Sequence, residues 1–174
     1  ERKVEQVAST DAPVLVTGES GTGKDLVSRS IHFNSKRAAK PYVTVNCAAI
    51  PETLLESVLF GHVKGAFTGA THNKVGEFQK ADGGTLFLDE LGELPLMLQA
   101  KVLRAIEQGE VSPVGSNDAP LRVDVRLVCA SSKSLPELVT QGTFDSRLLQ
   151  SLSGLTIRVP SLRELKYTAP YMHN

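Results

Sequence analysis

A glycine-rich heptapeptide, Gly18-Glu19-Ser20-Gly21-Thr22-Gly23-Lys24, constrains the fold of this chain more than any other segment. It follows an apolar run at Val14–Thr17 and precedes an amphipathic stretch that begins at Lys24, so it lies where a strand gives way to a helix. In that context, the spacing GxxxxGK predicts a loop whose backbone N–H groups surround phosphate oxygens, with Lys24 and the helix N-terminus adding positive potential. The alternative is a glycine-rich turn that binds no ligand. The motif therefore predicts an α/β unit, with phosphate binding as the functional hypothesis.

The rest of the chain alternates short apolar runs with amphipathic stretches, which indicates parallel strands joined by helical crossovers. Strands covered by helices on both faces are apolar throughout, and these runs have that composition. We therefore expect an α/β fold with a five-stranded parallel sheet. The expected strands are Val14–Thr17, Tyr42–Asn46, Thr85–Asp89, Val125–Ala130 and Leu155–Val159. The expected helices are Lys24–Asn34, Pro51–Phe60, Pro95–Gln108, Leu135–Gln141 and Asp145–Leu152.

Two segments interrupt this alternation. Gly61–Lys80 contains four glycines and cannot continue as one helix. Glu110–Arg122 carries turn-forming residues, and we expect it to form a hairpin or loop insertion; these residues are Pro113, Gly115, Ser116, Asn117 and Pro120. Long irregular segments inside a compact domain are often functional, so both are candidate interaction elements.

The composition narrows the classes of function. Nineteen Lys and Arg against nineteen Asp and Glu give a net charge of zero, which disfavours a globally basic nucleic-acid binder, and we expect no direct DNA-binding element. Aromatic residues make up 5% and Trp is missing, so a base-stacking platform is not expected. Cys47 and Cys129 lie in apolar runs without metal-ligand spacing and are expected to be buried thiols in a reducing compartment. No apolar run has membrane-spanning length, and we expect a cytoplasmic protein without membrane contact.

An apolar run that ends in two acids, Thr85-Leu86-Phe87-Leu88-Asp89-Glu90, forms the second half of the expected site. A carboxylate at the end of a buried strand is costly unless it serves a cation or a substrate. In nucleoside triphosphatases of this type, the first acid holds Mg²⁺ and the second polarises the attacking water. The alternative is a strand that ends in solvated acids. Behind a phosphate loop, the pair predicts binding of ATP and Mg²⁺ at Asp89, although Asp25 stands where Ser or Thr usually follows the lysine.

Taken together, these segments resemble the AAA+ domain of bacterial sigma-54-dependent transcriptional activators, the enhancer-binding proteins. GESGTGKD resembles the family's Walker A motif, in which an acidic residue commonly follows the lysine, and GGTLFLDELGELP resembles its Walker B segment. Gly65–Ala70 reproduces the family signature GAFTGA, and VNCAAIPETLLES and FGHVKGAF fill the intervening positions. The resemblance covers residues 1–164 and implies a three-layer AAA+ sandwich of the P-loop NTPase class. Residues 165–174 lack it, so we expect a tail there and no C-terminal helical lid.

The resemblance implies ATP and Mg²⁺ as cofactors and assigns roles residue by residue. Glu90 matches the catalytic acid, Asn46 matches the switch residue that hydrogen-bonds it, and Ser132 stands where the family has a sensor Asn. Asp89 matches the metal ligand. The positions that match the nucleotide-binding loop are Gly18, Glu19, Ser20, Gly21, Thr22, Gly23, Lys24 and Asp25.

Sigma-54 of RNA polymerase is the implied partner, and a homo-oligomeric ring is the implied assembly. An exposed Phe67 between flexible glycines suits a contact surface, whereas the alternative is a buried turn in which Phe67 fills the core. Glu110–Arg122 would be a second insertion beside this loop. The residues matched to the partner-binding loop are Gly65, Ala66, Phe67, Thr68, Gly69 and Ala70.

The chain departs from the family where arginine fingers are expected. The two positions hold Asp145 and Ser151, and Arg147 lies on another side of the same helix. Because such arginines accelerate hydrolysis by about three to five orders of magnitude, the isolated chain is expected to be a weak or inactive ATPase. A second function is therefore a nucleotide-binding interaction module with impaired hydrolysis. A small-molecule P-loop kinase is disfavoured by the GAFTGA segment and by the lack of an evident acceptor site.

Overall fold

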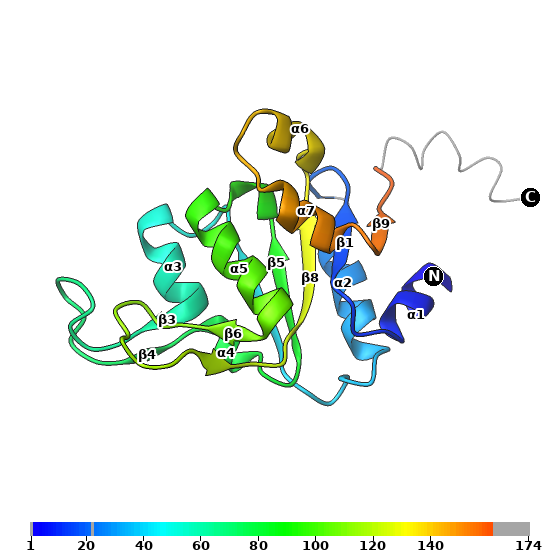
Figure 1. The fold of residues 1–174 in the computed structure, drawn as a ribbon. Coiled ribbons are helices and arrows are strands. Elements are labelled where there is room, and N and C mark those ends of the chain that lie inside the picture. The colour runs from blue at the N-terminus through cyan, green and yellow to red at the C-terminus, as the bar shows by residue number, and fades with distance from the viewer. Residues whose placement is uncertain (1, 22, 162–174) are drawn as a thin grey trace, which may run out of the picture.

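The protein is described by a computed structural model that covers residues 2–21 and 23–161 (Figure 1). Its helices are α1 (Arg2–Ala8), α2 (Lys24–Phe33), α3 (Glu52–Phe60), α4 (Glu77–Lys80), the 3₁₀ turn η1 (Leu91–Glu93), α5 (Leu96–Gln108), α6 (Leu135–Thr140) and α7 (Ser146–Leu152). Its strands are β1 (Val14–Thr17), β2 (Tyr42–Asn46), β3 (Gly61–His62), β4 (Lys74–Val75), β5 (Thr85–Asp89), β6 (Glu110–Val111), β7 (Leu121–Arg122), β8 (Arg126–Ser131) and β9 (Thr156–Arg158). The tail expected at 165–174 lies outside the described residues.

Five strands form one parallel sheet in the order β2-β5-β8-β1-β9, which confirms the predicted α/β fold. Strands β1, β2 and β5 have the predicted bounds. Strand β8 runs one residue later than expected because Ser131 pairs in register with Thr17 of β1. Strand β9 is shorter than expected and lies at the edge of the sheet.

The register brings distant parts of the chain to one edge of the sheet. Thr17 pairs with Ser131, and Asn46 pairs with Asp89, so these four strands end at the same level. The segments that follow the strands are the phosphate loop, the Cys47 turn, the acid pair and the serine turn after β8. Ligand sites in open parallel sheets lie at such carboxyl ends.

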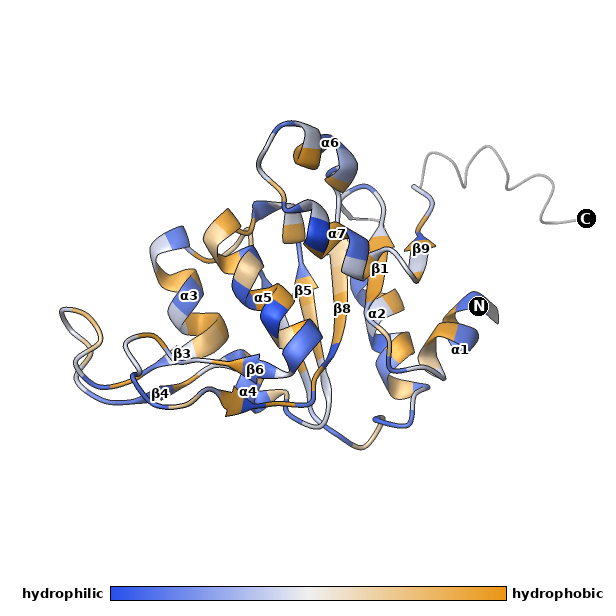
Figure 2. Cartoon of the chain, viewed as in Figure 1, coloured by the Kyte–Doolittle hydropathy of each residue, from blue (hydrophilic) through white to orange (hydrophobic). Residues whose placement is uncertain are grey.

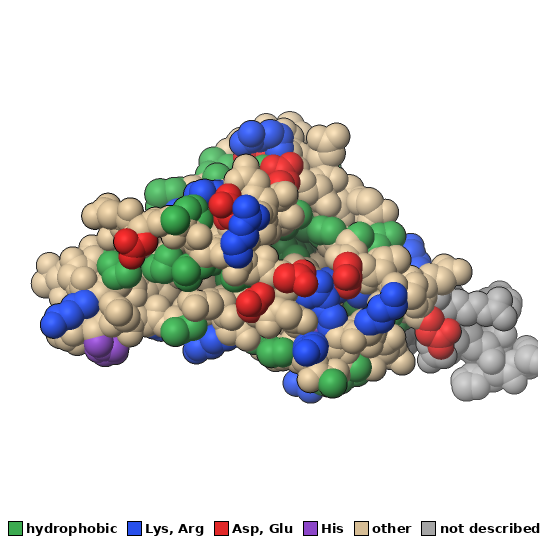
Figure 3. Space-filling model, turned by 60° about the horizontal axis from the view of Figure 1, so that its bottom comes forward, with side chains coloured by type: hydrophobic (Ala, Val, Ile, Leu, Met, Phe, Trp, Pro, Cys, Tyr) green, Lys and Arg blue, Asp and Glu red, His purple; other side chains and the backbone are tan. Residues whose placement is uncertain are grey.

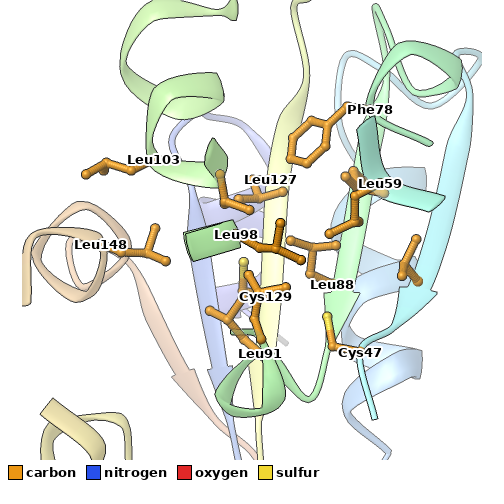
Figure 4. Close-up of a cluster of buried hydrophobic side chains, with 14 of the residues drawn as sticks. Cys47, Leu59, Phe78, Leu88, Leu91, Leu98, Leu103, Leu127, Cys129 and Leu148 are labelled. Carbon is orange, nitrogen blue, oxygen red and sulfur yellow. The ribbon is translucent and has the colours of Figure 1, made fainter. Parts of the chain in front are cut away.

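Helices cover both faces of the sheet, which gives three layers (Figure 1). One apolar cluster joins α1 and α2 to strand side chains such as Val14 and Val16. The other joins α3 to α7 to the opposite strand face, including Leu15, Leu88 and Cys129 (Figure 4). The central strands are apolar along their length, whereas the outer sides of the helices are polar (Figure 2). This two-sided burial explains why the central strands were recognisable as uniform apolar runs.

Both cysteines are buried, as predicted. Burial is the main influence on each thiol and raises the pKa of Cys47 to about 12, with the charges of Asp89 and Glu90 acting in the same direction. Burial also raises the pKa of Cys129 well above its usual value. Both groups are therefore protonated at neutral pH and pack as small apolar side chains.

The helix α1 was not predicted. Its last carbonyls, those of Val7 and Ala8, accept hydrogen bonds of 2.6 and 3.2 Å from the guanidinium of Arg126. Arg126 is 1% exposed, so it places a buried positive charge at the C-terminal end of α1, where the helix dipole favours it. A contact across 118 residues has no signature in the local sequence, which is why this helix was missed.

The two interrupting segments form small antiparallel pairs. Glu110–Arg122 is a hairpin of β6 and β7, which confirms the prediction. Gly61–Lys80, expected to be irregular, contains the β3–β4 pair and the short helix α4. Figure 1 shows both insertions extending together from the side of the domain below α3 and α5.

Acidic and basic side chains are interspersed over the face drawn in Figure 3, and neither sign gathers there in one broad patch. This distribution fits the zero net charge. In the part of the chain that the structure describes, no helix combines the length and apolar character needed to cross a membrane.

Candidate functional site

The phosphate loop has the backbone that the motif requires. Gly21 and Gly23 adopt positive φ values of 77° and 89°, which side-chain-bearing residues rarely adopt. Helix α2 begins directly after Gly23 and has no side-chain cap, so the loop presents backbone N–H groups with the positive end of the helix dipole. Lys24 is 6% exposed and its Nζ donates to Gly18 O at 2.7 Å. Thr22 lies outside the described residues.

Two cavities adjoin this loop. Gly18 and Glu19 line one of about 380 Å³, which reaches Ser132 on the turn after β8. Asp25 lines another of about 170 Å³ together with Asn46 and Asp89. Ser20 and Asp25 are exposed, so the loop is open on its outer side. The arrangement leaves room for an anionic ligand beside the loop and for a cation between the carboxylates.

Asp89 is a half-buried carboxylate at the end of β5. Its Oδ1 accepts a hydrogen bond of 2.9 Å from Glu90 N. Burial is the largest influence on this group and, together with the charges of Glu90 and Asp25, raises the pKa of Asp89 against the opposing effects of that hydrogen bond and of Lys24. A cation beside Asp89 would stabilise its charged form.

The donor set fits Mg²⁺ in the company of phosphate. Mg²⁺ usually takes one or two carboxylates plus phosphate oxygens and water. Asp89, with Asp25 on the same cavity, supplies that number of carboxylates. Within the described ranges, no group of three or more His, Cys, Asp or Glu gathers as an all-protein metal cage.

Glu90 is held in an unusual conformation next to Asp89. It is the single non-glycine residue with positive φ, 53°, in the described part of the chain. Its carboxylate accepts from Ser132 through three contacts, at 3.1 Å from the backbone N and at 2.8 and 2.9 Å from Oγ. Strained backbone of this kind clusters at functional sites, where the surrounding structure maintains it.

The hydrogen bond expected between Asn46 and Glu90 is not formed. The Asn46 side-chain oxygen instead accepts from Ala48 N at 2.9 Å and caps the turn that follows β2. Asn and Asp side chains often accept a hydrogen bond from the backbone two residues on, and Asn46 makes this local contact. Here Ser132, and not Asn46, holds the acid.

The GAFTGA loop projects from the β3–β4 pair. Gly65 and Gly69 have positive φ values of 84° and 95°, and Gly65 N donates to Ala70 O at 2.9 Å, which closes the loop. Phe67 is 45% exposed, so it does not fill the core. Its ring meets that of His62 edge-on, with centroids 4.9 Å apart. Thr68 is exposed beside it.

The second insertion packs against the base of this loop. Val63 N donates to Val114 O at 3.1 Å, and Val114 N donates to Gly61 O at 2.9 Å. A Cβ on Gly115 would lie 2.6 Å from the Cβ of Ala66, so only glycine allows this close approach. His62, whose Nδ1 lies 2.6 Å from Ser57 Oγ, also joins this contact and was not singled out from the sequence.

Of the two positions where arginine fingers were expected, Asp145 has a structural role. Asp145 is the N-cap of α7 and accepts from Arg147 N at 2.7 Å, a hydrogen bond that lowers the pKa of the Asp145 carboxyl. Buried Gln99 fixes this turn by accepting from Asp145 N at 2.7 Å. Arg147 is an exposed residue on α7, and Ser151 is half-buried. Gln99, missed from the sequence, is the residue that ties α5 to the start of α7.

Known proteins share this sequence and architecture. The model of the sigma-54 interaction domain matches residues 1–158. The transcriptional regulatory protein FlbD from Caulobacter vibrioides is 51% identical over 160 residues, which are 92% of this chain and 35% of FlbD. The anaerobic nitric oxide reductase transcription regulator NorR from Klebsiella pneumoniae is 52% identical over 163 residues, 94% of this chain and 31% of NorR. The crystal structure of NtrX from Brucella abortus in complex with ATP has a TM-score of 0.86 at 36% identity and covers 98% of this chain and 38% of NtrX. The chain spans about a third of the length of the curated relatives it matches.

Proposed function

Because the chain belongs to the family of sigma-54 interaction domains, we propose that it is the ATP-binding AAA+ domain of a sigma-54-dependent transcription activator. The observation that carries this proposal is the meeting of buried Lys24 with Asp89 and Glu90 at one edge of the sheet. The NtrX structure that shares this architecture holds ATP, which supports the same ligand here. Sigma-54 and ATP are both cytoplasmic, so we place the protein in that compartment.

Each group at the site has a task in this proposal. The backbone of Gly18–Gly23 and Lys24 hold the phosphates, because N–H groups and an ammonium converge there. Asp89, with Asp25 nearby, holds Mg²⁺, which supplies neutralising charge on the phosphates. Glu90 is the base that orients and polarises the attacking water. A carboxylate is suited to this task because one of its oxygens can accept a proton from water while the group stays hydrogen-bonded to Ser132.

The GAFTGA loop is the proposed contact with sigma-54 of RNA polymerase. Exposed Phe67 and Thr68 offer an apolar ring and a hydroxyl on a loop that two glycines allow to move. Hydrolysis in a homo-oligomeric ring would then move these loops against sigma-54 and remodel the polymerase complex. No residue in this proposal contacts DNA or a membrane.

The test is phosphate release from ATP and Mg²⁺ over a series of protein concentrations. Lys24→Ala serves as the blank, and Lys36→Ala, which removes an exposed lysine outside the site, serves as the matched control. We expect Lys36→Ala to bind ATP like the unaltered chain and Lys24→Ala to lose binding. Turnover that rises more than linearly with concentration would show subunits completing one another's sites. Equal ATP affinity in both lysine variants would overturn the phosphate-loop assignment.

A second candidate is a nucleotide-binding module with impaired hydrolysis. The observation that favours it is Asp145, which caps α7 at a position where the family has an arginine finger. A carboxylate there repels the γ-phosphate of a neighbouring subunit, whereas an arginine would stabilise its charge. Normal ATP binding with no phosphate release above the Lys24→Ala blank, at any protein concentration, would select this second candidate.

A further inference from the structure

A buried histidine, His62, lies where four segments meet at the base of the GAFTGA loop. It is 9% exposed and belongs to β3, where it pairs with Lys74 of β4 and bridges to Val114 of the second insertion. Its imidazole contacts both Ser57 of α3 and the ring of Phe67. His62 therefore connects the frame of the two insertions to the side chain at the tip of the loop.

The backbone around His62 is tightly constrained. A Cβ on Gly61 would lie 2.4 Å from Lys74 O, and one on Gly76 would lie 2.4 Å from Gly61 N. Both distances are shorter than real Cβ contacts, so the strands can approach this closely only with glycine at these positions. The strand pair therefore fixes the backbone from which the His62 ring contacts the loop.

Ser57 sets the orientation of the His62 ring. Ser57 Oγ lies 2.6 Å from His62 Nδ1, and both side chains are buried. Rotation about the last side-chain torsion of histidine is otherwise soft, because this torsion joins an sp³ carbon to an sp² carbon. A hydrogen bond at Nδ1 selects one orientation, whether the serine hydroxyl donates or accepts. The plane of the imidazole is therefore set from α3.

The plane of the imidazole determines how it meets Phe67. The two ring centroids are 4.9 Å apart and the planes are inclined by 73°, which is an edge-to-face contact. Phe67 is 45% exposed, so part of the residue is covered and part remains open to a partner. Gly65 and Gly69 on either side have positive φ values, and a Cβ on either would meet nothing within 4 Å. The contact with His62 therefore restrains Phe67 where the loop glycines allow movement.

We propose that His62 is a positioning residue for the contact with sigma-54, and that Ser57 orients its ring. The pair holds Phe67 in the orientation in which its exposed part meets the partner, so that less conformational freedom is lost on binding. This inference rests on the proposed function, because it takes the GAFTGA loop as the surface that binds sigma-54. It assigns the orientation of the loop tip to two side chains that lie outside Gly65–Ala70.

The first measurement is the environment of Phe67 in the free protein. 4-Fluorophenylalanine replaces phenylalanine throughout the chain, and the fluorine resonance of residue 67 is identified by its loss in Phe67→Leu. His62→Asn removes the aromatic ring and keeps a polar group for Ser57, and it is expected to move this resonance and to increase its isotope shift between H₂O and D₂O. The matched control is His72→Asn, because His72 is an exposed histidine of the same insertion whose Nδ1 contacts its neighbour Thr71. We expect the control to leave the resonance unchanged.

The second measurement is the dissociation constant for sigma-54 in the presence of ATP and Mg²⁺. We expect His62→Asn to weaken this association by roughly threefold to tenfold, the range that an edge-to-face aromatic pair supplies. Ser57→Ala frees the imidazole to turn and should weaken the association by a smaller factor in the same direction. His72→Asn should leave the dissociation constant unchanged.

A double variant separates the aromatic contact from the hydrogen bond. His62→Phe combined with Ser57→Ala restores a ring at position 62 and leaves no hydroxyl unpaired, so it should recover both the Phe67 resonance and the affinity for sigma-54. A role confined to the hydrogen bond would stay lost in this variant. The fluorine resonances of buried Phe87 and Phe144 in the same spectra show whether each variant is folded.

The remaining outcomes each decide the inference. A Phe67 resonance that is unchanged in His62→Asn would overturn it, and so would a shifted resonance with unaltered affinity for sigma-54; in both cases the proposed function stands. Equal effects of His62→Asn and His72→Asn, or a double variant that recovers neither signal, would also refute it. Failure of the unaltered chain to bind sigma-54 would overturn the proposed loop contact and this inference together.

Discussion

Glu90 combines its proposed chemical role with a backbone conformation that suits glycine better. At φ 53° the Cβ of an L-residue crowds the following carbonyl, which costs about 1–2 kcal/mol. The hydrogen bonds from Ser132 offset part of this cost by holding the carboxylate. The strain thus falls on the side chain to which we assign the catalytic role, and strained backbone is common at catalytic positions.

Two variants at this position separate the backbone from the side chain. Glu90→Ala and Glu90→Gly both remove the carboxylate, but only glycine relieves the positive φ. We expect Glu90→Gly to be more stable than Glu90→Ala by about 1 kcal/mol, after allowing for the greater freedom of glycine in the unfolded chain. Urea unfolding measures the difference. Equal midpoints for the two variants would mean that residue 90 is unstrained.

Residue roles were predictable only where the partner is local. The loop Gly18–Lys24 was recognisable because its glycine spacing and the helix that follows it are adjacent in the sequence. The pairing of Glu90 with Ser132 was not predictable, because it depends on β5 and β8 being neighbours in register, with Leu88 opposite Cys129. The hydrogen bond that Ala48 N donates to the Asn46 side chain is of a common local type, which sequence rules describe. The family resemblance instead predicted a bond between Asn46 and Glu90.

At the scale of elements, prediction succeeded for the strands of the parallel sheet that have four or more residues. Strands β1, β2 and β5 were located to the residue, whereas the short pairs β3–β4 and β6–β7 have too few residues for a periodic signal. Helix α7 was expected from Asp145 and begins at Ser146, because Asp145 is its N-cap. Helix α1 was missed because its anchor, Arg126, lies far along the chain.

The contact between the two insertions is an element-scale feature that a matched pair of glycines can test. Gly115 and Gly142 have nearly equal φ values, 79° and 81°. A Cβ at Gly142 meets nothing within 4 Å, whereas one at Gly115 would lie 2.9 Å from the Cα of Ala66. Both Ala variants should lose about 1 kcal/mol of stability from the backbone alone. Only Gly115→Ala should also displace the GAFTGA loop.

Hydrogen exchange over residues 65–70 is the measurement for this pair. We expect faster exchange of the Ala66 and Ala70 amides in Gly115→Ala, because their hydrogen bonds to Val63 O and Phe67 O hold the loop closed. Gly142→Ala should leave those amides unchanged. Similar exchange in both variants would show that the second insertion does not support the loop.

At the scale of the whole molecule, two helices connect the site to the two insertions. Helix α3 follows the turn after β2 and ends at Gly61, where β3 and the GAFTGA segment begin. Helix α5 follows η1, directly after Glu90, and ends at the β6–β7 hairpin. Figure 1 shows both helices running from the carboxyl edge of the sheet toward the insertions. A movement of Glu90 or of the turn after β2 can therefore reach the two insertions through α5 and α3.

Lys101 joins the middle of α5 to the middle of α3. Its Nζ forms an ion pair with Glu56 of α3 and lies 5.5 Å from the centre of the Phe60 ring. Both charged side chains are partly exposed, so the pair contributes about 1 kcal/mol or less to stability. Because Phe60 is the last residue of α3 before β3, the contacts of Lys101 suit it to keep the two helices moving as one body.

Replacement of Lys101 by Met should therefore weaken the contact between α3 and α5 and leave the proposed nucleotide site intact. We expect Lys101→Met to bind ATP with unchanged affinity, while the change that ATP causes in hydrogen exchange over residues 65–70 becomes smaller, with a coupling loss of about 1 kcal/mol. Lys80→Met, which removes an ion pair confined to α4, is the control and should retain the full response. A full response in Lys101→Met would mean that α3 alone carries the signal, because the turn after β2 would then reach the loop without help from α5.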